Sequence, residues 1–93
     1  MMKIVINVCF GGFGLSKEAY AELGLTWGKY NDAYHEHDKR TDPKLVAVVE
    51  KLGKAANDKL AKLAVVEIPD DVDWVIKEYD GREHVAEKHR AWY

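Results

Sequence analysis

A chain of 93 residues is long enough for one domain and too short for two. Its hydrophobic content of 47 %, with three Trp, five Tyr and two Phe, argues against disorder. The formal net charge of −2 argues against general binding of nucleic acids, which requires an excess of Lys and Arg. The single cysteine excludes an internal disulfide, and the apolar N-terminal run is too short to cross a bilayer. We therefore expect a soluble, cytoplasmic protein.

The chain begins with a predicted strand and a short helix. Residues 3–10 (KIVINVCF) are rich in β-branched side chains, and apolar residues on both faces favour a central place in a sheet. Residues 11–14 (GGFG) then break the strand. Ser16 is a suitable N-cap for a helix over residues 17–23, which Gly24 ends.

The segment that follows has the weakest pattern in the sequence. Thr26 is a possible cap for another short helix, on which Trp27, Tyr30 and Tyr34 would share one face. Residues 35–40 (HEHDKR) have no apolar periodicity, so they predict an exposed loop.

Residues 43–56 carry the clearest helical pattern. Asp42 is the predicted cap, and Pro43 takes the first helical position, where its missing N–H costs nothing. Apolar residues recur at helical spacing and predict a face directed toward the core, made of Leu45, Val48, Val49, Leu52 and Ala56.

The last third of the chain predicts a strand followed by a hairpin. Residues 63–68 (LAVVEI) form the strand, and the Asp80-Gly81 pair predicts a two-residue turn within residues 73–88. The turn fixes a pairing of Tyr79 with Arg82, Lys77 with His84 and Val75 with Ala86, and it directs Trp74, Ile76 and Val85 toward the core.

These elements predict a single α+β domain over residues 1–93. Its small mixed sheet would contain the N-terminal strand, the middle strand and the C-terminal hairpin. Two or three helices would pack against this sheet.

The glycine-rich turn before Ser16 is one candidate for ligand binding. Backbone N–H groups and a helix start can receive a phosphate there. The turn lacks the Lys-Ser/Thr pair of a phosphate loop and the third spaced glycine of a dinucleotide fingerprint. The alternative is a tight structural turn with Phe13 in the core.

Two groups of polar residues have metal-ligand chemistry, but neither completes a site by spacing alone. We therefore expect no metal and no cofactor. The groups are His35, His37 and Asp38, and His84, Glu87 and His89.

Cys9 is the one candidate nucleophile. The glycine-rich turn beside it would suit an oxyanion site, and His84 or His89 would have to serve as its base. A cysteine at the end of a buried strand more commonly acts as a small hydrophobe, so we expect no catalytic residues.

The C-terminal tail interleaves cations with aromatic rings. Lys88, His89 and Arg90 precede Trp92 and Tyr93. Rings beside an arginine are suited to holding a nucleobase and its phosphate, and equally to docking the chain end on a second subunit.

Most of the chain resembles a widespread family of small, mostly uncharacterised bacteriophage proteins. The opening, MKIVINxCFGGFGLS, is the longest match, and Val8 stands where the family pattern has a basic residue. The resemblance also covers residues 42–46, 66–71, 79–81 and 85–90 together with Trp92, but not residues 27–39.

The resemblance extends to phage proteins that sequester cyclic nucleotide signals of host defence such as CBASS. It implies a non-enzymatic, homo-oligomeric protein of the host cytoplasm that binds a small nucleotide. A protein–protein inhibitor of a host enzyme and a small Cys9-dependent enzyme are the alternatives. The candidate ligand-binding residues are Gly11, Gly12, Phe13, Ser16, Tyr79, Arg90 and Trp92.

Overall fold

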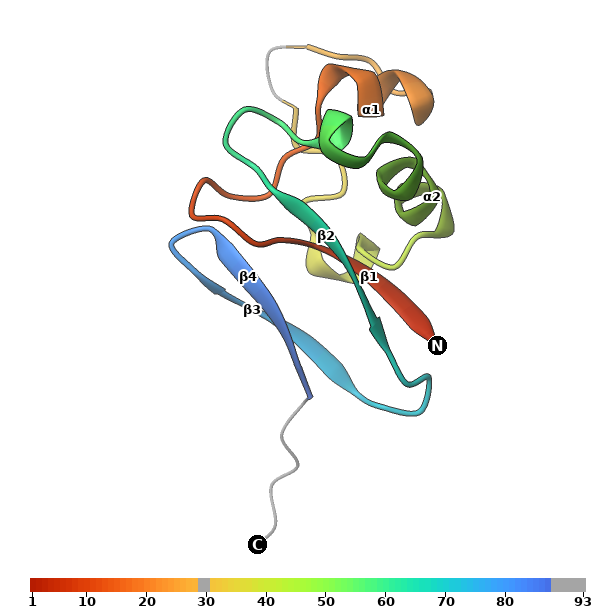
Figure 1. Ribbon diagram of the computed structural model, residues 1–93, viewed down its shortest axis with the longest axis vertical. Helices are drawn as coiled ribbons and strands as arrows, with labels where there is room; N and C mark the ends of the chain where they lie inside the picture. The colour runs from red at the N-terminus through yellow and green to blue at the C-terminus, as the bar shows by residue number, and fades with distance from the viewer. Residues whose placement is uncertain (29–30, 88–93) are drawn as a thin grey trace, which may run out of the picture.

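The computed structural model describes residues 1–28 and 31–87, and it confirms the α+β class (Figure 1). Within these residues, two short 3-10 helices, His37–Lys39 and Gly53–Ala56, accompany the main elements. In chain order, the main elements are β1 (Met2–Asn7), α1 (Lys17–Glu22), α2 (Pro43–Leu52), β2 (Leu63–Ile68), β3 (Trp74–Tyr79) and β4 (Arg82–Glu87).

The four strands of the described residues form two antiparallel pairs rather than one mixed sheet. β1 pairs with β2, and β3 pairs with β4. In Figure 1 the helices lie on one side of the β1–β2 pair and the β3–β4 hairpin lies on the other. β1 is therefore apolar on both faces because a different layer covers each face, and not because it is central in a sheet.

The first core cluster lies between the β1–β2 pair and the helices. The predicted stripe of α2 is confirmed, since Leu45, Val48 and Val49 are buried and Leu52 packs against them. Asp42 caps α2 through the Lys44 N–H at 2.8 Å. The α-helix ends at Leu52, because Gly53 has a φ of 56°, and a 3-10 turn carries the chain to the buried Ala56.

The second cluster lies between the β1–β2 pair and the hairpin. Ile4 and Ile6 of β1 contact Ile76 of β3, with Trp74 and Val85 packed around them. The side chains predicted to face the core do so. The predicted hairpin register is also confirmed, and Asp80 and Gly81 adopt φ values of 49° and 87°.

One prediction for the middle of the chain is wrong, and another is confirmed except at Arg40. Residues 26–28 and 31–36 form no helix, and Trp27 instead meets Tyr20 edge to face at 5.1 Å. Tyr30 lies outside the described residues. The loop over 35–40 is exposed only as far as Lys39, since Arg40 is fully buried.

No helix in the described part of the chain is long and apolar enough to cross a membrane.

Candidate ligand-binding site

The glycine-rich turn is packed against two other turns of the molecule. A Cβ on Gly11 would lie 1.8 Å from the Leu60 carbonyl oxygen. A Cβ on Gly81, at the hairpin tip, would lie 2.6 Å from the Gly12 nitrogen and 2.7 Å from the Phe10 oxygen. These glycines are thus required where backbones approach one another closely.

Ser16 caps α1 as predicted, but the start of this helix is covered. The Ser16 hydroxyl accepts from the Ala19 N–H at 3.1 Å and donates to the Ala55 carbonyl. The Ser16 N–H donates to the Ala56 carbonyl at 2.9 Å, and the residue is 7 % exposed. The 3-10 turn Gly53–Ala56 therefore takes the Ser16 N–H and hydroxyl that a phosphate would need.

Phe13 belongs to the core, as predicted by the alternative in which the glycine-rich segment is a tight structural turn. It is 8 % exposed, and the Arg40 guanidinium lies 3.5 Å from the centre of its ring. The edge of the ring meets His35 at 6.4 Å. Arg40 covers the ring face that a stacked base would require.

Arg40 and Glu83 form a buried ion pair that fastens the hairpin to the body of the protein. Arg40 donates from Nη1 to Oε1 at 2.7 Å and from Nη2 to Oε2 at 2.9 Å. The guanidinium also donates to the carbonyls of Tyr34, His35 and Val5. Such a bidentate pair fixes the position of both side chains.

The environment of Glu83 keeps it ionised. Burial alone would raise its pKa, but hydrogen bonds from Arg40 and from the Asn7 N–H, together with the charges of Arg40 and His37, outweigh burial and lower the pKa. The Asn7 bond is 2.9 Å long, and the His37 ring lies 4.0 Å from Oε2. Glu83 therefore has a structural role: it holds the tip end of the hairpin against β1 and Arg40.

Asn7 connects the same three turns through its side chain. Its amide donates to the carbonyls of Cys9 and Gly81, each at 2.7 Å, and its Oδ1 accepts from the Lys62 N–H at 2.8 Å. The residue is fully buried. The polar residue that interrupts the first apolar run thus holds the hairpin tip beside the end of β1.

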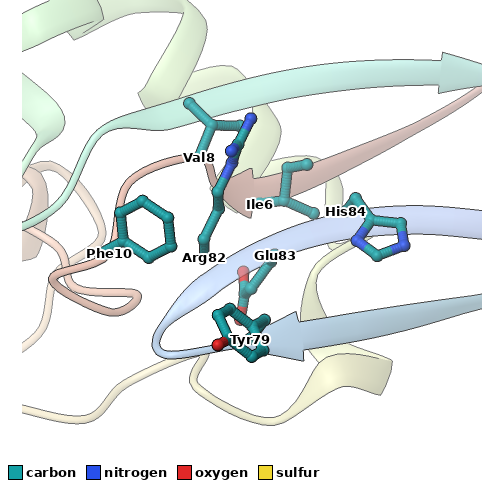
Figure 2. Close-up of a pocket in the computed structure, with 7 residues that line it drawn as sticks. All are labelled: Ile6, Val8, Phe10, Tyr79, Arg82, Glu83 and His84. Atoms are coloured by element: carbon teal, nitrogen blue, oxygen red, sulfur yellow. The ribbon is translucent and has the colours of Figure 1, made fainter.

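A pocket of about 470 Å³ opens between that hairpin tip and the end of β1. Figure 2 shows Arg82 reaching from β4 past the Phe10 ring toward Val8. The Arg82 guanidinium carbon lies 5.8 Å from the centre of the Phe10 ring, within the range of a cation–π contact. The pocket is lined by Ile6, Val8, Phe10, Tyr79, Arg82, Glu83 and His84.

Alternation along the hairpin separates its charges. One face carries its basic side chains, Lys77, Arg82 and His84, and the other carries its acidic side chains, Glu78, Glu83 and Glu87. Within the described residues, no carboxylate forms a salt bridge with Arg82. A chain with net negative charge thus presents a local basic surface beside two exposed rings.

The described residues predicted for the site do not all lie in this pocket. Tyr79 lines the pocket and is 74 % exposed, whereas Gly11, Gly12, Phe13 and Ser16 do not line it. Arg90 and Trp92 lie outside the described residues.

The sequence did not predict most of the pocket residues as ligand contacts, and three of them, Phe10, Arg82 and His84, carry its chemistry; His84 was a candidate only as a metal ligand or as a base for Cys9. Phe10 is 61 % exposed, although it ends an apolar run that predicts burial. The predicted hairpin register already paired Tyr79 with Arg82 and placed His84 two residues further along the same face. That register was the available signal for two of the three.

The other candidate chemistry gains no support. Within the described residues, no group of three or more potential metal ligands is gathered at one place. The Cys9 thiol contacts the Leu60 carbonyl at 2.9 Å and the Asn7 side-chain oxygen at 3.3 Å, and neither oxygen is a base that could activate it.

Comparison of the chain with protein-family models, curated proteins and solved structures finds no match.

Proposed function

We propose that this protein binds and sequesters a small, cyclic nucleotide without cleaving it. The observation that carries the proposal is the pocket at the hairpin tip, where exposed Phe10 and Tyr79 flank Arg82. Aromatic faces beside a guanidinium suit a ligand that joins a flat base to a phosphate. The pocket volume is also within the usual range for small-molecule sites.

The parts of the pocket suggest how such a ligand would lie. A phosphate would meet Arg82, with His84 as a second polar contact, while a base would stack on Phe10 or Tyr79. Val8 and Ile6 supply an apolar wall, and Val8 contributes no charge where the family pattern has a basic residue.

The phage origin, the host cytoplasm and the defence signal as ligand come from the resemblance of the opening motif. Arg90 and Trp92 remain proposed ligand contacts on the resemblance alone, because β4 begins beside the pocket at Arg82 and ends at Glu87, at the opposite end of the hairpin.

The direct test is a thermal-shift screen with cyclic mono-, di- and trinucleotides, followed by calorimetry. A ligand present at 100 times its Kd stabilises the folded state by about 2.7 kcal/mol, which is readily detected. Added salt should weaken binding, because the site is exposed and the contact is ionic.

Two substitutions locate the site, and one serves as a control. Arg82→Ala should weaken binding by roughly 10- to 100-fold, the usual effect of losing a charge-assisted hydrogen bond. Tyr79→Ala should weaken it as well. Lys59→Ala removes an exposed cation that does not line the pocket, and it should leave the affinity unchanged. Unchanged binding by Arg82→Ala would exclude this pocket, and removal of residues 90–93 tests the tail in the same assay.

Sequestration without turnover has its own readout. A bound nucleotide should be recovered intact after the protein is denatured and the supernatant is analysed by chromatography. Steady conversion to a linear product would instead favour the enzymatic alternative.

Inhibition of a host protein is the second candidate, and one observation favours it. Phe10, Leu60 and Tyr79 are 61 %, 70 % and 74 % exposed, and the turns that carry them meet at one end of the molecule. Exposed apolar groups gathered at one place commonly mark protein contacts. A screen in which no nucleotide binds would favour this candidate.

A further inference from the structure

Within the described residues, the outer edge of β2 is open beyond Leu63, whose N–H donates to the Asn57 side-chain oxygen at 2.9 Å. The Val8 N–H donates to the Lys62 carbonyl at 2.8 Å, and this bond identifies which alternate residues of β2 point their backbone N–H and C=O groups toward β1. Counting in steps of two from Lys62, Ala64 and Val66 direct their N–H and C=O groups toward β1, whereas Val65 and Glu67 direct theirs away from it. Within the described residues, neither the Val65 N–H nor the Glu67 N–H finds an acceptor.

The corresponding edge of β1 is closed at Val5 and Asn7. The Val5 N–H donates to the Arg40 carbonyl at 3.0 Å, and the Asn7 N–H donates to Glu83 at 2.9 Å. The protein thus covers one edge of this two-stranded ladder with its own loop and hairpin, and no described residue bonds to Val65 or Glu67 on the other edge.

β2 also lacks the features that normally protect an edge strand. Its sequence, LAVVEI, contains no Lys and no Pro, and Glu67 is its one charged residue. β3, in contrast, carries Lys77 and Glu78 in its exposed half. Natural proteins place charges, prolines or bulges on edges that must stay unpaired, so an edge that carries only one charge is suited to pairing with another strand.

We infer that β2 pairs antiparallel with β2 of a second copy of this chain. A two-fold axis at Val66 opposes Val65 of one copy to Glu67 of the other and Glu67 to Val65. The outward backbone groups of these two residues then bond to each other with none left over, which is why an identical strand fits. The result is one continuous sheet in the order β1–β2–β2–β1.

The charges are compatible with this pairing. Glu67 is the carboxylate nearest the axis, and Lys3 lies directly opposite it on β1. The Lys3 ammonium donates to Glu50 at 2.9 Å, and its charge also acts on Glu67, so it offsets part of the repulsion between the two glutamates. This inference does not rest on the proposed nucleotide.

The first test measures mass in solution. Sedimentation or light scattering of the full chain should give about 21 kDa, twice the 10.6 kDa of one chain. Glu67→Pro removes an N–H that the β1–β2 ladder does not use, so it should give a folded 10.6 kDa monomer with an unchanged circular dichroism spectrum. Glu67→Ala keeps the N–H and should remain a dimer.

The second test fixes the register by cross-linking in a Cys9→Ala background. A non-hydrogen-bonded pair at the axis has Cα atoms about 4.5 Å apart, within disulfide range, so Val66→Cys should form a disulfide-linked dimer on mild oxidation. Glu67→Cys places the two cysteines on diagonal positions with Cα atoms about 7–8 Å apart, too far for a disulfide, and should stay unlinked.

Three results would overturn the inference. One is a monomer for the unmodified chain at every concentration. Another is a folded Glu67→Pro variant that remains a dimer. The third is a chain that dimerises only after residues 88–93 are removed, because the tail of the same chain would then be the strand that covers this edge.

Discussion

The buried ion pair allows the sharpest prediction about stability. Glu83→Ala removes the carboxylate and leaves Arg40, which is fully buried, without its counter-charge. Breaking a buried pair from one side typically costs about 3–5 kcal/mol, because the remaining charge is uncompensated. Arg40 would keep the carbonyls of Tyr34, His35 and Val5 as acceptors, so we expect the lower end, about 3 kcal/mol.

This loss is large beside the total stability of the domain. A chain of 93 residues is expected to unfold with roughly 5–14 kcal/mol. With a urea dependence of about 1.5 kcal/mol/M, a loss of about 3 kcal/mol lowers the urea midpoint by about 2 M. Equilibrium unfolding followed by circular dichroism measures this shift directly.

The matched control is an exposed ion pair of the same length. Lys51 donates to Glu22 at 2.8 Å on the surface, and Glu22→Ala should cost only about 0–1 kcal/mol because water replaces the lost partner. The double variant Arg40→Met/Glu83→Leu removes both charges and should be more stable than Glu83→Ala alone. If Glu83→Ala costs no more than Glu22→Ala, the Arg40 charge is solvated and the reasoning is refuted.

Two further predictions concern pH and backbone packing. The folded protein lowers the pKa of Glu83 below its ordinary value of 4.5, so the stabilisation from the ionised carboxylate is complete above about pH 4.5 and is lost as pH falls through the lowered folded-state pKa. The difference in free energy of unfolding between the unmodified chain and Glu83→Gln, measured by urea unfolding across pH, should therefore shrink in acid. A difference that stays constant with pH would contradict this. Gly11→Ala should lower the free energy of unfolding by about 1–3 kcal/mol, because the added methyl meets the Leu60 carbonyl. Gly28→Ala, whose added methyl meets no atom of the described residues within 4 Å, should change it by less than about 0.5 kcal/mol.

The features predicted correctly from the sequence are those determined by local pattern. The α2 stripe repeats at helical spacing, and the Asp80-Gly81 turn fixes every pair of the hairpin by counting outward from it. The Ser16 cap likewise depends on residues three positions away. In each case the information lies within a few residues of the element itself.

The buried polar network could not be predicted in this way. Arg40 lies in a stretch of charged residues that predicts exposure, and its partner Glu83 is 43 positions away. Asn7 interrupts an apolar run, and its partners belong to turns near Leu60 and Gly81. A polar residue at an otherwise buried strand position does indicate a buried partner, but only the fold identifies which one.

The two phenylalanines of the first turn illustrate the same limit. Phe10 continues the strand and predicts burial, whereas Phe13 stands among glycines and was a candidate for stacking a ligand. The structure exposes Phe10 and buries Phe13 under Arg40. Alternation no longer determines direction once the chain leaves β1, so the turn geometry alone decides which ring faces water.

The glycines therefore act on the candidate site indirectly. Gly11 allows the first turn to approach Leu60, and Gly81 allows the hairpin tip to approach the backbone of Phe10 and Gly12. This double approach brings Arg82 within 5.8 Å of the Phe10 ring and forms one wall of the pocket. A side chain at either glycine would push the turns apart and separate the ring from the guanidinium. The glycine-rich motif, a candidate phosphate site in the sequence, thus holds together an aromatic and a cationic side chain that lie far apart along the chain.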